Sequence, residues 1–224
     1  MGHPPVRLIL VTGGARSGKS DYAERRALEL GAEAVTYVAT AAPGDDEMAR
    51  RIARHRDGRP RGWRTVEAPR DAGAAVCAAA TDVVLLDCLT LLASNALLSV
   101  AGRDGGEGAE DAAQAAVVSE VDALCAAAAG RSGTLLVVTN EVGLGVVPPT
   151  PLGRWFRDAL GAANRRLAAA ADEVVLLVSG VPVHVKGRAP LPAPTGGSFG
   201  GRPAGTDEPL ARETAAERGG SMEG

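Results

Sequence analysis

The sequence predicts an α/β protein, a mostly parallel sheet flanked by helices. Two observations support this. Short, nearly continuous apolar segments rich in β-branched residues alternate with longer helix-like stretches, and a glycine-rich loop joins the first apolar segment to the first helix. Strands buried on both faces of a parallel sheet are continuously apolar, and a β-α-β-α order is typical of right-handed crossovers. The 224 residues suffice for one such domain.

Five strands and five helices are expected from this pattern. The strands are 8–12, 34–40, 83–87, 134–139 and 174–179, and the helices are 21–30, 45–56, 89–98, 110–128 and 152–171. The helix at 45–56 opens with acids and closes with arginines, as the helix dipole favours, and Pro151 suits the first turn of the last helix. The alternating segment 181–186 predicts an edge strand, in which His184 is more consistent with a structural role than a catalytic one.

The predicted organisation is a single nucleotide-binding domain, residues 1–186, followed by a tail, residues 187–224. The tail is rich in Gly, Pro and small polar residues and has few large apolar side chains. Such a composition buries too little surface to offset the entropy of ordering, so the tail is expected to be disordered.

Charge and composition indicate which classes of partner the protein does not bind and in which compartment it is expected. The net charge of −3 lacks the basic excess of a nucleic-acid binder. No apolar run approaches the roughly 20 residues that span a bilayer, and the N-terminus is too short and polar for a signal peptide. Cys77, Cys88 and Cys125 are widely spaced, which favours reduced thiols over a disulfide or metal site. We therefore expect a cytoplasmic protein that binds neither nucleic acid nor membrane.

The glycine-rich loop matches the phosphate-binding pattern GxxxxGK[ST]. Its residues are Gly13, Gly14, Ala15, Arg16, Ser17, Gly18, Lys19 and Ser20. The loop follows a strand and opens a helix, the context in which backbone N–H groups and the helix dipole bind phosphate. Lys19 is expected to reach the β- and γ-phosphates, and the Ser20 hydroxyl to bind Mg²⁺. The alternative is a glycine-rich turn that matches the pattern by chance.

Asp87 ends the apolar segment 83–87. A carboxylate at the end of a strand beside a phosphate loop is suited to hold Mg²⁺, whereas the alternative role is to cap the next helix. The loop alone does not distinguish an ATPase, GTPase, kinase or nucleotidyltransferase. The NKxD pattern of switch GTPases is not found.

His55 lies among Arg54, Arg56 and Arg59 at the end of the helix predicted at 45–56. Nearby positive charge favours a neutral, nucleophilic imidazole, and the same arginines are suited to hold a triphosphate. The helix C-terminus acts in the opposite direction, because it favours imidazolium. His55 is therefore a candidate covalent phosphorus acceptor, and a solvated basic helix end is the alternative.

Five segments resemble, in order, the bifunctional adenosylcobinamide kinase/adenosylcobinamide-phosphate guanylyltransferase family of cobalamin synthesis. They are GGARSGKS, DDEMARRIARHR with RPRGWRTVE, LLDCLT, TNEVGLGVVP and RWFRDALGAANRRLAAAADEVVLLVSG. The resemblance extends over about residues 8–186. It implies a RecA-like P-loop fold and a homotrimer. It also implies two reactions, phosphorylation of adenosylcobinamide by ATP or GTP, and transfer of GMP from GTP through a guanylyl-histidine to adenosylcobinamide phosphate.

The resemblance also implies roles for particular residues. His55, the one histidine of its block, corresponds to the guanylylated residue. Further nucleotide contacts are implied at Ala39, Thr40, Ala41, Arg56, Asp57, Gly58, Arg59 and Glu67. The chain departs from the family at Arg54, at Asn164-Arg165, where many members have Asn-Gln, and in the segment after Lys186.

Two other functions remain open. A different P-loop small-molecule kinase would use Lys19, Ser20 and Asp87 without a covalent intermediate. A non-enzymatic GTP-binding module would bind nucleotide without corrinoid turnover. The sequence does not distinguish ATP from GTP in the kinase step.

Overall fold

The computed structural model describes residues 7–42, 59–101 and 108–187. The predicted helix at 45–56 and residues His55, Arg56, Asp57 and Gly58 lie outside these ranges. The strands are β1 (Leu8–Gly13), β2 (Val35–Ala39), β3 (Arg64–Glu67), β4 (Val83–Asp87), β5 (Thr134–Val138), β6 (Glu173–Val178) and β7 (Val181–Lys186). The helices are α1 (Lys19–Gly31), α3 (Ala72–Ala78), α4 (Leu89–Ala101), α5 (Ala109–Gly130) and α6 (Pro151–Ala170).

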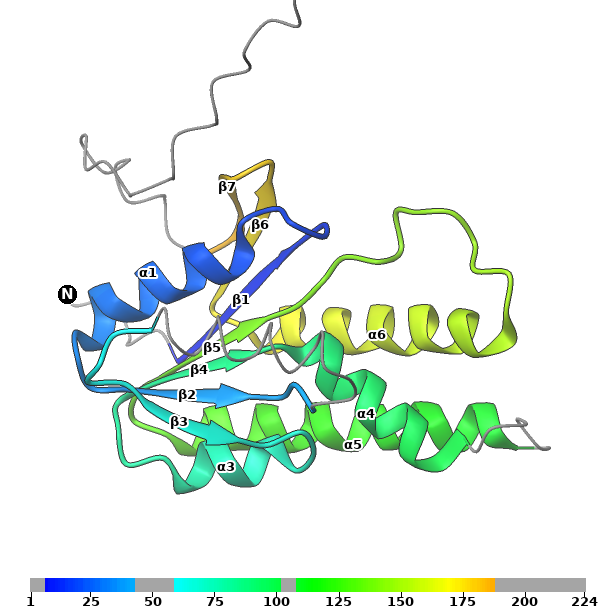
Figure 1. Cartoon of the computed structure of the whole chain (residues 1–224), viewed down its shortest axis with the longest axis horizontal. Coiled ribbons are helices and arrows are strands. Elements are labelled where there is room, and N and C mark those ends of the chain that lie inside the picture. Colours follow the sequence, from blue (N-terminus) through cyan, green and yellow to red (C-terminus); the bar gives the residue numbers. More distant parts are fainter. Residues whose placement is uncertain (1–6, 43–58, 102–107, 188–224) are drawn as a thin grey trace, which may run out of the picture. The chain divides into compact units, whose positions relative to one another are not determined.

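The seven strands form one sheet in the order β3-β2-β4-β5-β1-β6-β7. All neighbouring strands are parallel except β6 and β7, which are antiparallel. The carboxyl ends of β1, β2, β4 and β5 therefore meet at one edge of the sheet (Figure 1). This arrangement confirms the predicted α/β class and the edge strand at 181–186.

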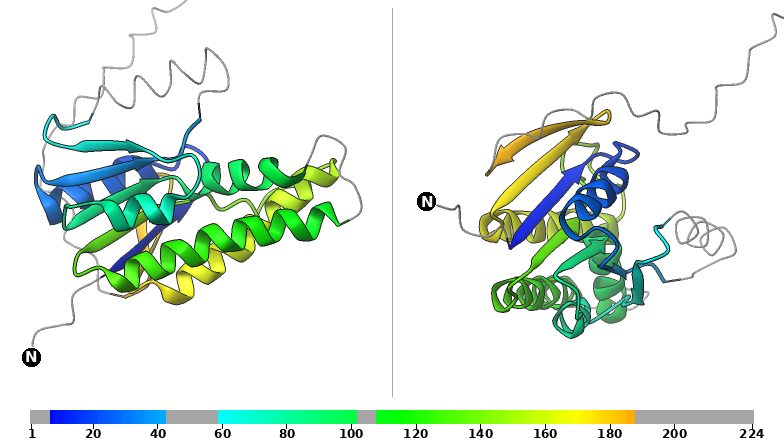
Figure 2. Two further views of the ribbon diagram at one scale, coloured as in Figure 1. Left: turned by 90° about the horizontal axis from the view of Figure 1, so that it is seen from below. Right: turned by 90° about the vertical axis from the view of Figure 1, so that its left-hand side faces the viewer.

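Helices cover both faces of the sheet. Helix α1 packs on one face, over a cluster that includes Ile9, Val11 and Leu85. Helices α3, α4, α5 and α6 cover the other face, where the larger cluster includes Leu86 and Leu124 (Figures 1 and 2). Because the strands are buried on both faces, their sequences are continuously apolar, which made them predictable.

The sequence analysis missed β3 and α3. Strand β3 has four residues and charged residues at both ends, and it lies at the edge of the sheet, so its sequence lacks the apolar run of a central strand. Helix α3 has seven residues, five of them alanine or glycine. Neither the composition nor the length of α3 produces a clear amphipathic pattern.

A buried carboxylate from another helix stabilises the start of α3. Glu120 of α5 accepts hydrogen bonds from the backbone N–H groups of Asp71 (2.9 Å) and Ala72 (3.3 Å) and from Nε of Arg70 (3.1 Å). Glu120 thereby satisfies amides that no side chain of α3 itself caps. The start of α6 follows the expected pattern, since Pro151 is in its first turn and the Thr150 hydroxyl accepts from the Gly153 N–H.

Helix α5 corrects the expectation that no segment is apolar enough to span a bilayer. Among the described residues it is the one helix whose length and mean hydropathy reach that range. Its apolar character comes largely from alanines, and core helices pass the same test. Helix α5 packs against α3, α4 and α6, and Figure 2 shows it lying beside α6.

Candidate functional site

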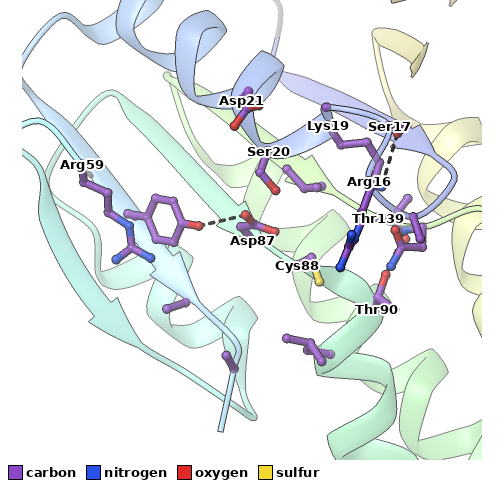
Figure 3. A pocket seen from close by; sticks show the side chains of 18 residues that line it. Arg16, Ser17, Lys19, Ser20, Asp21, Arg59, Asp87, Cys88, Thr90 and Thr139 are labelled. Atoms are coloured by element: carbon purple, nitrogen blue, oxygen red, sulfur yellow. Dashed lines mark hydrogen bonds between the residues drawn. The ribbon is translucent and has the colours of Figure 1, made fainter. Parts of the chain in front are cut away.

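A pocket of about 640 Å³ lies at the carboxyl edge of the sheet, beside the glycine-rich loop (Figure 3). It is lined by Ala15, Arg16, Ser17, Gly18, Lys19, Ser20, Asp21, Tyr37, Ala39, Ala41, Arg59, Asp87, Cys88, Thr90, Leu91, Val138, Thr139 and Asn140. These residues come from the loop and from the ends of several strands. Ligands bind at this edge in open α/β sheets.

The loop between β1 and α1 takes its shape from glycines. Gly18 precedes α1 with a φ of 84°, a left-handed conformation that favours glycine. A Cβ on Gly13 would lie 2.5 Å from the Leu177 carbonyl oxygen. Ser17 fixes the loop further, because its N–H donates to the Gly14 carbonyl and its own carbonyl accepts from the Gly180 N–H.

Lys19 is held inside this loop. Its side chain is largely buried, and Nζ donates to the Gly14 carbonyl (2.5 Å) and to Oγ of Ser17 (3.5 Å). Burial lowers the pKa of the ammonium, while Cys88 and Asp87 act in the opposite direction. No carboxylate within the described ranges forms an ion pair with Lys19, so its charge is available to a phosphate.

Asp87 ends β4 and lines the pocket, and a side chain of β2 holds its carboxylate. The Tyr37 hydroxyl donates to Oδ2 of Asp87 at 2.9 Å, a bond drawn dashed in Figure 3. The Arg59 guanidinium lies 3.5 Å from the centre of the Tyr37 ring, and its Nη1 donates to the Thr65 hydroxyl. Tyr37 therefore contacts both the carboxylate and the arginine of the site.

Burial and the Asp87 charge also alter the acid–base behaviour of the site. Burial, and secondarily Asp87, raises the pKa of Tyr37, so its hydroxyl stays protonated and donates to the carboxylate. The same two causes raise the pKa of Cys88 to about 11. Glu24 of α1 has a pKa raised to about 7, mainly by burial and then by Asp87, with Arg59 opposing.

Most predicted site residues in the described ranges come together here. Loop residues 15–20 line the pocket with Ala39, Ala41, Arg59 and Asp87, and Gly13 and Gly14 shape the loop. Thr40 does not line it. The Thr40 hydroxyl donates to the Cys88 carbonyl (2.7 Å) and accepts from the Cys88 N–H (2.8 Å), so it holds the backbone beside Asp87. Glu67 is exposed at the end of β3, and it too does not line the pocket. Nucleotide contacts at Thr40 and Glu67 stay predictions.

Sequence reasoning missed several lining residues, among them Tyr37, Thr90 and Asn140. Tyr37 lies in the middle of β2, Thr90 in the first turn of α4 and Asn140 two residues after β5, and no local pattern marks them. Thr90 and Asn140 could have been found, since residues that follow parallel strands gather at the same edge of the sheet.

The pocket offers oxygen atoms to a small divalent cation. The Ser20 hydroxyl and the Asp87 carboxylate both line it, and these hard donors fit Mg²⁺. Among the described residues no group of three or more His, Cys, Asp and Glu side chains is arranged to hold a metal. That is compatible with Mg²⁺, which usually takes one or two protein ligands together with water and substrate phosphates.

Residues 9–185 match the model of the CobU family, described as cobinamide kinase / cobinamide phosphate guanyltransferase. The chain belongs to this family. The match covers every described strand and helix except the first residue of β1 and the last of β7.

Curated members of the CobU family are similar over almost their whole length. The bifunctional adenosylcobalamin biosynthesis protein CobU of Salmonella typhimurium is 48% identical over 182 residues, which cover 80% of this chain and 99% of that protein. CobU of Escherichia coli is 46% identical over the same shares. The bifunctional protein CobP of Pseudomonas aeruginosa is 42% identical over 80% of this chain and 96% of its own.

One solved structure has a distant similarity to this chain. The flagellar accessory protein FlaH from Methanocaldococcus jannaschii has a TM-score of 0.40 and 13% identity, over 83% of this chain and 81% of that one.

Proposed function

We propose that this CobU-family enzyme phosphorylates adenosylcobinamide with ATP or GTP, and then transfers GMP from GTP through His55 to adenosylcobinamide phosphate. The product is adenosyl-GDP-cobinamide, an intermediate of cobalamin synthesis. The family match over residues 9–185 supports both activities, as do the bifunctional names of the three relatives.

The observation that carries the proposal is the convergence of Lys19, Arg59 and Asp87 on one pocket beside the phosphate loop. The loop amides and Lys19 would bind the β- and γ-phosphates. Ser20 and Asp87 would hold Mg²⁺, which when bound would neutralise charge on these phosphates. In the kinase step the substrate hydroxyl attacks the γ-phosphorus, the nucleoside diphosphate leaves and the hydroxyl proton is released.

The guanylyl transfer uses His55. An imidazole nitrogen attacks the α-phosphorus of GTP, a P–N bond forms and pyrophosphate leaves. A phosphate oxygen of adenosylcobinamide phosphate then attacks the same phosphorus, and the P–N bond breaks. Division into two substitutions makes each one easier. Arg59, four residues after His55, lines the pocket and has no carboxylate partner among the described residues, which supports a nucleotide site shared with the phosphate loop.

The decisive experiment is to incubate the purified protein with α-³²P-GTP and Mg²⁺ and then denature it. We expect acid-labile, alkali-stable label on the wild-type chain and none on His55→Ala. The matched control is His184→Ala, because His184 lies on β7 and does not line the pocket. It should keep the label.

Absence of label from folded, GTP-binding wild-type protein would contradict the guanylyl-histidine and favour a P-loop kinase without a covalent intermediate. GTP binding with no turnover of either corrinoid substrate would favour a binding module. If His55→Ala were labelled as strongly as the wild-type protein, the GMP would be attached to a residue other than His55.

The proposal also covers the oligomeric state of the enzyme and its place in the cell. The enzyme is proposed to be a cytoplasmic homotrimer, as the family resemblance implies. Sedimentation equilibrium should give about three times the chain mass of 22.7 kDa. A monomeric mass would contradict this part of the proposal and would leave the catalytic assignment intact.

A further inference from the structure

The backbone around Asn140, two residues after the end of β5, is held at the pocket by several hydrogen bonds. The Asn140 N–H donates to the Thr90 hydroxyl (2.9 Å), and the Asn140 carbonyl accepts from Nδ2 of Asn164 (2.9 Å). The residues on either side are also held, since the Thr139 N–H donates to the Val11 carbonyl (2.9 Å) and the Glu141 N–H to the Gly13 carbonyl (3.0 Å). The Thr139 hydroxyl also donates to Oδ1 of Asn164 at 2.7 Å. Asn164 is buried, so these contacts are shielded from water.

The Asn140 side chain itself forms no hydrogen bond with the described residues, although it lines the pocket. The other two asparagines differ. Asn164 uses both amide atoms on the loop, and Asn95 donates to the carbonyls of Thr40 and Pro69. The fixed backbone limits where the Asn140 amide can reach, and the amide has no competing partner among the described residues, so a bound ligand need not displace an existing hydrogen bond.

The position of Asn140 indicates which part of a nucleotide it meets. Strand β5 lies between β1, which leads into the phosphate loop, and β4, which ends at Asp87. The loop amides surround the inner phosphates of a bound triphosphate, and Lys19 reaches the outer ones. A terminal phosphate that extends past Lys19 toward Asp87 would pass over the end of β5.

We propose that the Asn140 side-chain amide donates a hydrogen bond to the terminal phosphate of the bound nucleoside triphosphate, and so distinguishes triphosphate from diphosphate. This inference rests on the proposed function, which places the triphosphate in the pocket. Donation to an anionic oxygen is stronger than a neutral hydrogen bond, and Asn140 adds no charge beside Asp87.

The test compares GTP and GDP affinities by calorimetry for the wild-type protein, Asn140→Ala and Asn140→Asp. We expect Asn140→Ala to weaken GTP binding about tenfold, the size of one lost bond to a charged group, and to leave GDP binding within about twofold. Asn140→Asp should weaken GTP binding further, because its carboxylate repels phosphate. The melting temperature of Asn140→Ala should stay unchanged, since the removed amide bonds no described residue.

Equal weakening of GTP and GDP, or no change in either, would overturn the role of Asn140. Asn164→Ala serves as the comparison variant, because it keeps the Asn140 amide and removes the tether on its carbonyl. It should lower the melting temperature together with GTP affinity. Failure of the wild-type protein to bind any triphosphate would overturn the proposed function as well, whereas failure of the Asn140 variants alone leaves the proposed function standing.

Discussion

At the scale of single residues, burial and neighbouring charge determine the chemistry of the pocket. Tyr37 shows this, because it donates to Asp87 while its ring face contacts the Arg59 guanidinium. A cation 3.5 Å from a ring centre is attracted by the electrons of the ring face. One buried side chain therefore contacts both the carboxylate at the end of β4 and a guanidinium from the segment before β3.

Glu24 gives a prediction about pH. Its pKa is raised from 4.5 to about 7 in the folded protein, so the folded state binds the proton more tightly than the unfolded state does. The contribution of Glu24 to the free energy of unfolding should therefore fall as the pH rises from about 4.5 to 7. Glu24→Gln should flatten this slope and should raise stability at pH 8 relative to wild type.

Urea denaturation of the nucleotide-free protein at pH 5 and pH 8 measures this slope. Glu33→Gln, an exposed change after α1, is the control and should keep the wild-type slope. Identical slopes for Glu24→Gln and wild type would show that Glu24 titrates normally.

The phosphate-loop residues were predictable one by one, because a loop that wraps a phosphate needs glycines and a lysine at fixed spacing. Tyr37 and Asn140 were not, since what places them in the pocket is the pairing of distant strands. Tyr37 reaches Asp87 across fifty residues of sequence. Such contacts require the strand order, which local pattern does not contain.

At the scale of elements, the sequence specified the central strands better than the edge of the sheet. The apolar runs of β1, β4 and β5 follow from burial on both faces, and each lies within a residue or so of its predicted range. Helix α3 depends instead on Glu120, which is supplied by α5. A sequence pattern within α3 could not have revealed this support.

Glu120→Ala should destabilise the protein by about 2–4 kcal/mol. The change leaves two amides and the Arg70 guanidinium without their buried partner. The matched control is Asp122→Ala on the same helix. Asp122 forms an ion pair with Arg166, but both side chains are substantially exposed, so the loss should be below about 1 kcal/mol.

Urea denaturation of both variants measures the two effects. Equal losses for Glu120→Ala and Asp122→Ala would mean that the cap on α3 contributes nothing beyond a surface pair. Hydrogen exchange should also show faster exchange in α3 for the Glu120 variant.

At the scale of the whole molecule, the family match ends at residue 185, and the aligned 182 residues cover 99% of the Salmonella relative. The division of the chain into a catalytic domain and a tail after residue 186 stays a prediction. A chain that ends after Gly187 should keep its melting temperature within about 2 °C and keep full GTP labelling.

Differential scanning calorimetry and the labelling assay check this together, with the full chain as control. A substantial drop in melting temperature, or loss of label, would show that residues 188–224 contribute to the fold or the site. Stopping instead after Val178 should destabilise the protein strongly, because β7 pairs with β6 along its length.

The contact between Tyr37 and its neighbours has an optical consequence. Trp63 is almost buried, its indole N–H donates to the Ala32 carbonyl, and its ring centre lies 6.4 Å from that of Tyr37. The other tryptophan, Trp155, lies on α6, so Trp155→Phe leaves Trp63 as the single indole fluorophore. Any ligand that draws Arg59 away from the Tyr37 ring changes the surroundings of Trp63, and its emission would then report occupancy without an attached dye.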